Sequence, residues 1–321
     1  LLRELVLGRL GARRPETLIG ARLGVDAAAI ALDGDVCVLT TDPITTASSG
    51  AGRLAVHVVC NDLAVMGAEP VGLLATLLFP PGVTSEAIAK LTQEIDATAC
   101  EENVEVLGGH TEVAPGLSQP LVVMAGVGRA RRDRLVTAGG ARPGDALVLT
   151  RAAGLEGSHI LANDLAAQLL AVPEALLEEA RGYASELSVV AHARHALDLG
   201  ATAMHDPTEG GVIGALWEMA EASGAGFRVL ADQIPVREPT RAICAALGVD
   251  PLRVIASGAL LIACPDGPAM AAALGATVIG EITASGRVLI HPEGRIENVD
   301  DLDRDELYRV LESAGGEHRP G

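Results

Sequence analysis

One segment, AVHVVCNDLAVM (residues 55–66), constrains the fold most, because it is apolar on nearly every side of a helix and yet carries Asp62 in its middle. A helix of this kind has to be enclosed by other elements. An ionised carboxylate inside such an enclosure costs several kcal/mol unless it is paired, hydrogen-bonded or bound to a metal. The segment therefore predicts a large packed core with a carboxylate that has a specific role.

The chain has 321 residues, and a prior of about 150 residues per domain predicts two domains. The hydrophobic content of 49% is enough for packed cores and argues against disorder. The arginine-rich run at 129–134 and the glycine and proline residues at 139–144 mark a change of composition near 130–145. We place the domains at 1–135 and 136–321.

Both halves alternate strand-like and helix-like patterns, which predicts an α/β fold. The apolar run at 71–79 is read as a buried strand, and Thr84 or Ser85 is expected to begin the helix that follows. The expected strands are 35–41, 71–79, 104–107, 121–127, 146–150, 256–264 and 276–281, and the expected helices are 54–66, 84–99, 157–172, 187–199 and 212–222.

Charge and composition exclude several classes of function. The net charge of −18 opposes binding to nucleic acid or to anionic membrane surfaces. Lys90 is the only lysine, so a Walker-A phosphate loop is absent. The five cysteines are scattered without C-x-x-C spacing and are expected to be buried apolar residues. No apolar stretch reaches about 18 residues and no signal-peptide pattern opens the sequence, so we expect a cytoplasmic protein.

Four aspartates lie in surroundings that do not suit a charge: Asp26 in an apolar segment, Asp42 at the end of a strand, Asp62 in the apolar helix, and Asp206 before a helix. A hard divalent cation with oxygen ligands, above all Mg²⁺, stabilises such carboxylates and often arrives with substrate phosphates. The plainer alternative is that each aspartate caps a helix or a turn.

Two glycine pairs are a second feature that indicates phosphate binding. Gly108 and Gly109 follow a predicted strand, and Gly210 and Gly211 begin a predicted helix. Glycine lets backbone N–H groups approach an anion closely, and a helix N-terminus favours negative charge. Ordinary turns are the alternative meaning of such pairs. Together with the aspartates, the pairs predict a phosphate-binding arrangement that needs no lysine.

These motifs occur in a recognisable order, and the chain resembles the PurM-like superfamily. Its members include aminoimidazole ribonucleotide synthetase, thiamine-monophosphate kinase, selenophosphate synthetase and the hydrogenase maturation protein HypE. The resemblance runs over nearly the whole chain and is most specific in the motif NDLAVMGAEP (61–70). The other matching motifs are GVDA (24–27) with TD (41–42), GGHT (108–111) and HDPTEGG (205–211).

The resemblance implies an N-terminal α+β domain that forms a homodimer through a β-barrel and a C-terminal α/β domain, with ATP and Mg²⁺ as cofactors. It assigns the metal to acidic positions and the nucleotide to an asparagine and the two glycine motifs. The implied metal ligands are Asp26, Asp42, Asp62 and Asp206, and the implied cofactor-binding residues are Asn61, Gly108, Gly109, His110, Thr111, Gly210 and Gly211.

Two positions depart from the pattern of HypE and of the kinase, which have acidic residues where this chain has Val25 and His110. The motifs otherwise look most like HypE. That protein acts on its own C-terminal cysteine, whereas the last cysteine here is Cys264, so we do not expect self-cyanation within these residues. The expected partner set is ATP, a small substrate, a second copy of the chain and a maturation protein.

We therefore expect an ATP-dependent enzyme that activates an oxygen of a small carbonyl, amide or phosphate substrate. Glu209 or His205, beside the predicted helix start, is the expected proton carrier. A phosphotransferase like thiamine-monophosphate kinase is one alternative. The other is a non-catalytic, HypE-like maturation factor that binds a protein partner.

Overall fold

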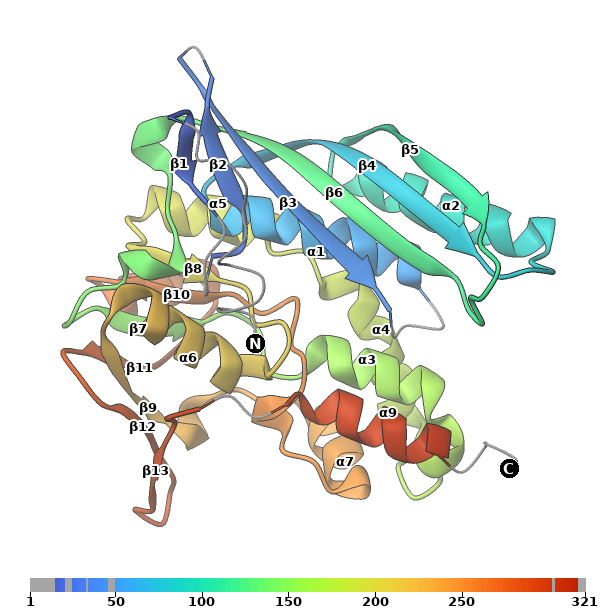
Figure 1. Ribbon diagram of the computed structural model, residues 1–321. Coiled ribbons are helices and arrows are strands. Elements are labelled where there is room, and N and C mark those ends of the chain that lie inside the picture. The colour runs from blue at the N-terminus through green and yellow to red at the C-terminus, as the bar shows by residue number, and fades with distance from the viewer. Residues whose placement is uncertain (1–14, 21–24, 33, 46–49, 302–303, 317–321) are drawn as a thin grey trace. The chain divides into compact units, whose positions relative to one another are not determined.

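The structure, a computed structural model, describes residues 15–20, 25–32, 34–45, 50–301 and 304–316 (Figure 1). Val25 lies within these ranges, whereas Gly24 of the first motif and the last five residues lie outside them. The chain divides into a first unit, Leu1–Thr137, and a second unit, Ala138–Gly321. Each unit has its own sheet, as the alternation of patterns in both halves predicts.

The first unit is built on a six-stranded sheet in the order β1-β2-β3-β6-β4-β5. Its pairs are antiparallel except for β4 with β5, which run parallel and are joined through a helix, as parallel pairs require. The strands are β1 (Thr17–Ile19), β2 (Ala28–Ala31), β3 (Val36–Ile44), β4 (Glu69–Phe79), β5 (Glu105–Val113) and β6 (Leu121–Ala130).

Two helices cover one face of this sheet, α1 (Ala51–Val65) and α2 (Ser85–Glu101) (Figure 1). Helix α1 is buried on nearly all sides, as its sequence predicts. It ends at Val65, with Met66 as its C-cap, because Gly67 adopts a left-handed φ of 77°. Helix α2 begins after Thr84, whose hydroxyl accepts the Ala87 N–H at 3.2 Å. Both helix predictions are confirmed.

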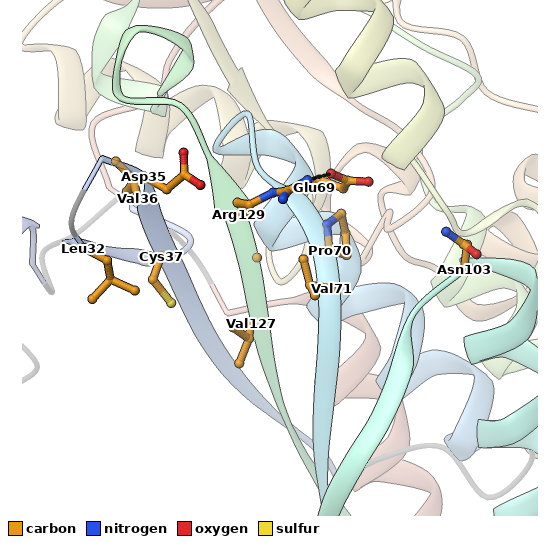
Figure 2. Close-up of a pocket in the computed structure, with 11 residues that line it drawn as sticks. Leu32, Asp35, Val36, Cys37, Glu69, Pro70, Val71, Asn103, Val127 and Arg129 are labelled. Carbon is orange, nitrogen blue, oxygen red and sulfur yellow. Dashed lines mark hydrogen bonds and ion pairs between the residues drawn. The ribbon is translucent and has the colours of Figure 1, made fainter.

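The opposite face of the sheet is less covered than its sequence suggested. The run at 71–79 was expected to be a buried strand, but β4 alternates between buried and exposed positions, and 45% of the surface of Leu74 is accessible. A hollow of about 460 Å³ lies on this side, between the ends of β3, β6 and β4 (Figure 2). Val71 and Val127 line it, and the Arg129–Glu69 ion pair borders it.

The second unit contains a seven-stranded sheet in the order β13-β12-β9-β11-β7-β10-β8. Only β12 with β9 is parallel. The strands are β7 (Ala146–Leu149), β8 (Ala203–His205), β9 (Gly226–Leu230), β10 (Leu261–Cys264), β11 (Thr277–Thr283), β12 (Arg287–Ile290) and β13 (Ile296–Asn298).

Helix α6 packs on the sheet, whereas α3, α4, α7 and α9 share a second apolar core. The predicted helix 157–172 is too long, since α3 ends at Asp164 and a short 3-10 turn follows at 166–168. The helices are α3 (Leu155–Asp164), α4 (Glu174–Gly182), α5 (Val190–Asp198), α6 (Gly211–Ser223), α7 (Glu238–Leu247), α8 (Gly267–Leu274) and α9 (Glu306–Gly316). No described helix combines the length and the apolar character needed to span a membrane.

Candidate functional site

In the first unit, two of the four aspartates meet at one hydroxyl group. Thr40 in β3 donates a hydrogen bond of 2.6 Å to Oδ2 of Asp62 in α1, and its hydroxyl also lies 3.1 Å from the backbone oxygen of Asp26. Asp62 is only 7% exposed. The strand β3 and the helix α1 thus hold Asp62 and the backbone of Asp26 at one place.

Asp42 lies on the same face of the sheet as Thr40, two residues further along β3. The sequence predicted that the strand ends before Pro43, but β3 runs through Pro43 to Ile44 and pairs Asp42 with Met124. The β2–β3 ladder ends at Leu39, so this end of β3 pairs with β6 alone, and a strand with one unpaired edge tolerates a proline. Asp42 is therefore a half-buried strand residue rather than a strand-end residue.

The oxygen chemistry of this set suits Mg²⁺, which prefers carboxylates, carbonyls and phosphate oxygens. Magnesium is commonly bound by one or two protein carboxylates, and phosphate oxygens and water complete its shell. Asn61, the neighbour of Asp62, is completely buried in α1.

The GGHT motif was expected to follow the strand 104–107, and the structure contradicts this. Gly108, Gly109, His110 and Thr111 lie inside β5, the exposed edge strand, and pair with residues 74–77 of β4. A Cβ on Gly109 would lie 1.8 Å from the Ala75 oxygen, so this glycine permits the close approach of two strands. His110 lies 3.0 Å from Glu112 on the exposed surface.

In the second unit, the HDPTEGG motif forms the connection from β8 to α6. His205 ends β8, and its Nε2 lies 2.8 Å from Oε2 of Glu218 in α6. Asp206 follows directly and is 1% exposed. The Pro207 oxygen accepts the Ala256 N–H at 3.1 Å, which fixes the chain after the buried pair. Of the candidate proton carriers, His205 is buried and already has a carboxylate partner.

The two glycines of this motif do not present free N–H groups. The Gly210 N–H donates to Oδ2 of Asp305 at 2.7 Å, and the Gly211 N–H donates to the Thr208 oxygen at 3.0 Å. Both glycines have left-handed φ angles, 84° and 63°. In this conformation they shape the helix start, whereas the sequence predicted that they donate to a phosphate.

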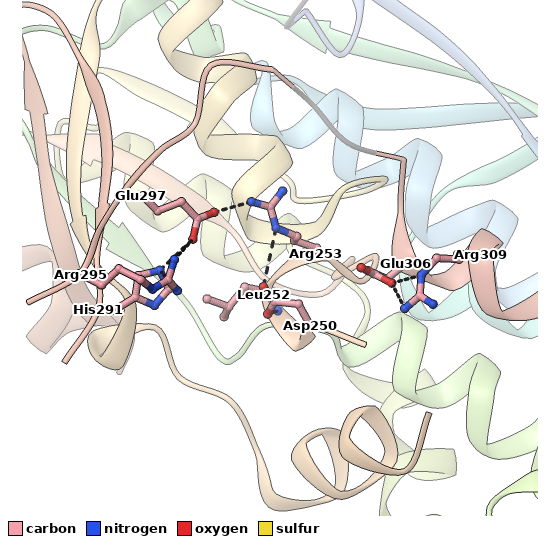
Figure 3. A network of polar contacts seen from close by, with 8 residues as sticks. All are labelled: Asp250, Leu252, Arg253, His291, Arg295, Glu297, Glu306 and Arg309. Carbon is pink, nitrogen blue, oxygen red and sulfur yellow. Dashed lines mark hydrogen bonds and ion pairs between the residues drawn. The ribbon is translucent and has the colours of Figure 1, made fainter. Parts of the chain in front are cut away.

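Gly211 also lies against the backbone of residues 252–254. A Cβ on it would lie 2.7 Å from the Leu252 oxygen and 2.6 Å from the Val254 oxygen. This segment is held by Arg253, which donates to Glu297 at 2.6 Å, and Glu297 in turn lies 2.8 Å from His291 (Figure 3). The polar network thereby stabilises the backbone of residues 252–254, against which Gly211 packs.

Sequence reasoning missed several groups around this loop. Tyr308 donates to Oε1 of Glu209 at 3.2 Å, and Asp305 accepts from Gly210. Glu156, at the start of α3, is 4% exposed, and burial raises its pKa to about 7, with Glu209 and Asp305 adding to the rise. Glu156 lies in an apolar run, so the criterion that found Asp62 could have found it. Asp305 lies in an acidic stretch, where that criterion does not single it out.

Comparison with curated proteins finds relatives along most of the chain. A provisionally described hydrogenase expression/formation protein of Methanocaldococcus jannaschii is 32% identical over 277 residues, which cover 82% of this chain and 78% of the relative. The carbamoyl dehydratase HypE of Cupriavidus necator is 30% identical over 309 residues, which cover 90% and 86%.

Solved structures share the fold. HypE in complex with ATP matches with a TM-score of 0.74 and 24% identity over 95% of this chain and 93% of that chain. HypE in the HypE–HypF complex matches with a TM-score of 0.71 and 23% identity over 87% and 93%. The N-terminal and C-terminal domains of one family match residues 24–130 and 142–291. With both domains matched in order, the chain belongs to the AIR synthase related protein family.

Proposed function

We propose that this chain is a Mg²⁺-dependent, ATP-using dehydratase that activates the oxygen of a carbamoyl group. The similarity to carbamoyl dehydratases over 90% of the chain supports the reaction class. The ATP complex of a structural neighbour supports the nucleotide. The observation that carries the metal part is the meeting of Asp62 and Asp26 at the Thr40 hydroxyl.

We propose the following reaction. The amide oxygen attacks the γ-phosphorus of ATP and ADP leaves; the C–O bond then breaks, phosphate departs, and the nitrogen gives up its two protons to leave a nitrile. Glu209 is the proposed acceptor of a proton, because its carboxylate is oriented by Tyr308, whereas His205 is occupied by Glu218. Magnesium, when bound, supplies charge neutralisation on the phosphate oxygens.

The metal ligands that we propose in the first unit are Asp62 with Asp26 or Asp42, and Thr40 orients Asp62 for this role. In the second unit, we propose Asp206 as a further acidic ligand because it is buried beside His205 at the end of β8. We retain Asn61 and the β5 motif, Gly108–Thr111, as proposed nucleotide-binding residues of the first unit.

The buried cysteines are not proposed as carriers of the carbamoyl group. Burial raises the pKa of Cys244 to about 12 and that of Cys264 to about 11, and it also raises the pKa of Cys60. A thiol acts as a nucleophile in its thiolate form, which these three groups do not populate near neutral pH.

We also propose that the chain forms a homodimer through the outer face of the first sheet and that it binds a maturation protein. The apolar residues exposed on β4 and β5, including Val71, Leu74 and Val106, support the first statement. The HypE–HypF complex supports the second.

The test is a calorimetric titration of the protein with a non-hydrolysable ATP analogue, with and without Mg²⁺. We expect Asp62→Asn to weaken binding about tenfold or more, equal to about 1.4 kcal/mol, only when Mg²⁺ is present. Asp96→Asn changes an exposed aspartate on α2 and serves as the matched control. Equal affinity of parent and Asp62→Asn in Mg²⁺ would remove the metal assignment.

A second assay incubates the protein with ATP and carbamoyl compounds and follows phosphate and nitrile together. Equal amounts of the two products support the dehydratase. A phosphorylated acceptor would instead show a phosphotransferase. Tight binding of Mg²⁺ and ATP without turnover, even with the maturation partner present, would show a non-catalytic factor.

A further inference from the structure

One carboxylate lies between the starts of two helices. Oδ1 of Asp305 accepts the Leu307 N–H at 2.7 Å and so caps α9, while Oδ2 accepts the Gly210 N–H at 2.7 Å just before α6. Asp305 is 3% exposed. A carboxylate that accepts backbone N–H groups at helix N-termini is stabilised by charge-assisted hydrogen bonds and by the helix dipoles.

A second contact runs from the same helix to the preceding residue of the loop. The Tyr308 hydroxyl donates to Oε1 of Glu209 at 3.2 Å. The backbone at Gly210 and the side chain of Glu209 are thus both held from α9.

Helix α9 is itself firmly placed. Leu307 and Val310 are buried in the core that α9 shares with α3, α4 and α7. The β8–α6 loop is also held by residues 252–256. Gly211 lies close to their backbone, and the Ala256 N–H donates a hydrogen bond to the Pro207 oxygen. The loop is therefore held between two fixed supports, and α9 provides the one that contacts Glu209.

We propose that Asp305 and Tyr308 are positioning residues, through which the C-terminal helix α9 sets the orientation of Glu209 and Gly210 for the reaction. This inference rests on the proposed function, because it assigns the purpose of the contacts to the ATP-dependent site. The Gly210 amide then serves the architecture of the loop and does not bind phosphate.

Two substitutions test the two hydrogen bonds separately, one from Gly210 to Asp305 and the other from Tyr308 to Glu209. Asp305→Asn keeps the shape but supplies one acceptor oxygen and an NH₂ group, so one of the two N–H groups then faces a donor. Tyr308→Phe removes only the hydroxyl. Arg309→Ala is the matched control. Arg309 donates to the Gly248 oxygen at 3.1 Å and, within α9, to Glu306 (Figure 3), and neither contact involves the loop.

The measurements are the hydrogen exchange of the Gly210 and Leu307 amides, the melting temperature, and kcat and KM for ATP. We expect exchange at one of these two amides to rise at least about tenfold in Asp305→Asn, because one of the two N–H groups loses its acceptor. In both Asp305→Asn and Tyr308→Phe, kcat should fall about tenfold or more with KM for ATP within about twofold of the parent, since a transition-state contact is disturbed. Arg309→Ala should retain the parent kcat.

The outcomes are distinct. Unchanged exchange at both the Gly210 and the Leu307 amide in Asp305→Asn, together with a parent-like kcat in both variants, would overturn the inference. A higher affinity for ATP in Asp305→Asn would also overturn it, because it would mean that Asp305 competes with a phosphate. If Asp305→Asn does not fold, Tyr308→Phe decides by kcat alone. If the parent shows no ATP turnover, the proposed function fails, and exchange at Gly210 still reports whether α9 holds the loop.

Discussion

Oδ2 of Asp62 accepts a 2.6 Å hydrogen bond from the Thr40 hydroxyl, which joins a helix apolar on nearly all sides to the central part of the first sheet. The bond explains how α1 accommodates a carboxylate, because a hydrogen bond to a charged group offsets part of its desolvation.

Thr40→Val removes this hydroxyl while keeping the shape of the side chain. We expect the free energy of unfolding to fall by about 1–3 kcal/mol, because Asp62 loses a buried partner, and we expect weaker nucleotide binding in Mg²⁺. Urea denaturation and calorimetry measure the two effects. Thr40→Ser, which keeps the hydroxyl, should restore most of both, and a Val variant equal to the parent would contradict this role for Thr40.

Gly109→Ala should destabilise the first unit more than Gly108→Ala. The new methyl group would lie 1.8 Å from the Ala75 oxygen at position 109, whereas at position 108 its nearest neighbour is Leu74 at 4.0 Å. The two glycines have similar φ angles, 154° and 150°, so the backbone contribution is matched. We expect a difference of about 1–3 kcal/mol in denaturant unfolding. Equal losses would show that β4 and β5 separate easily at this point.

The stability of the second unit should depend on pH through Glu156. Burial raises its pKa from 4.5 to about 7, so between these values the folded state keeps a proton that the unfolded state has lost. The contribution of protonated Glu156 to the free energy of unfolding is therefore fully present below pH 4.5 and is lost as the pH rises through about 7.

Glu156→Gln removes this ionisation. The variant should match the parent near pH 5 and exceed its stability at pH 8 by up to about 3.5 kcal/mol, which is the pKa difference converted at about 1.4 kcal/mol per unit. Denaturant titrations at both pH values measure this. A constant difference between the two proteins across this range would argue against a buried, titrating carboxyl group.

Leu74→Glu should dissociate the proposed homodimer, because it places a charge on the exposed apolar side of β4. Light scattering during gel filtration gives the mass, and we expect the variant to elute as a monomer where the parent is dimeric. Leu170→Glu, which changes an exposed leucine of the second unit, is the control. A dimer that survives Leu74→Glu would place the contact elsewhere.

Helices with a distinct apolar pattern could be predicted from the sequence. The α1 segment and the Leu91–Ile95–Ala99 stripe of α2 are examples, because burial of those faces dominates their energetics. The sequence did not reveal that β5 continues through its glycines, since strand pairing with β4 overrides the usual meaning of a glycine pair. It also did not reveal that one face of β4 is exposed, because an apolar run does not state how many of its sides are covered.

The candidate site could be predicted only in part. Isolated carboxylates in apolar segments were visible, but their partners were not, because Thr40 is an ordinary strand residue in sequence terms and its role arises from the packing of α1. Similarly, Asp305 is separated from Gly210 by 95 residues. Contacts of that range follow from the arrangement of elements, which local patterns do not determine.

The first sheet also determines when this half of the chain can acquire its structure during synthesis. Strand β3 pairs along its whole length with β6, joining Val36 to Ala130. That pairing cannot form on the ribosome before residue 130 has emerged, so β4 and α1, which depend on the same sheet, wait with their apolar residues uncovered. The nascent first unit thus keeps apolar surface exposed until its last strand is available.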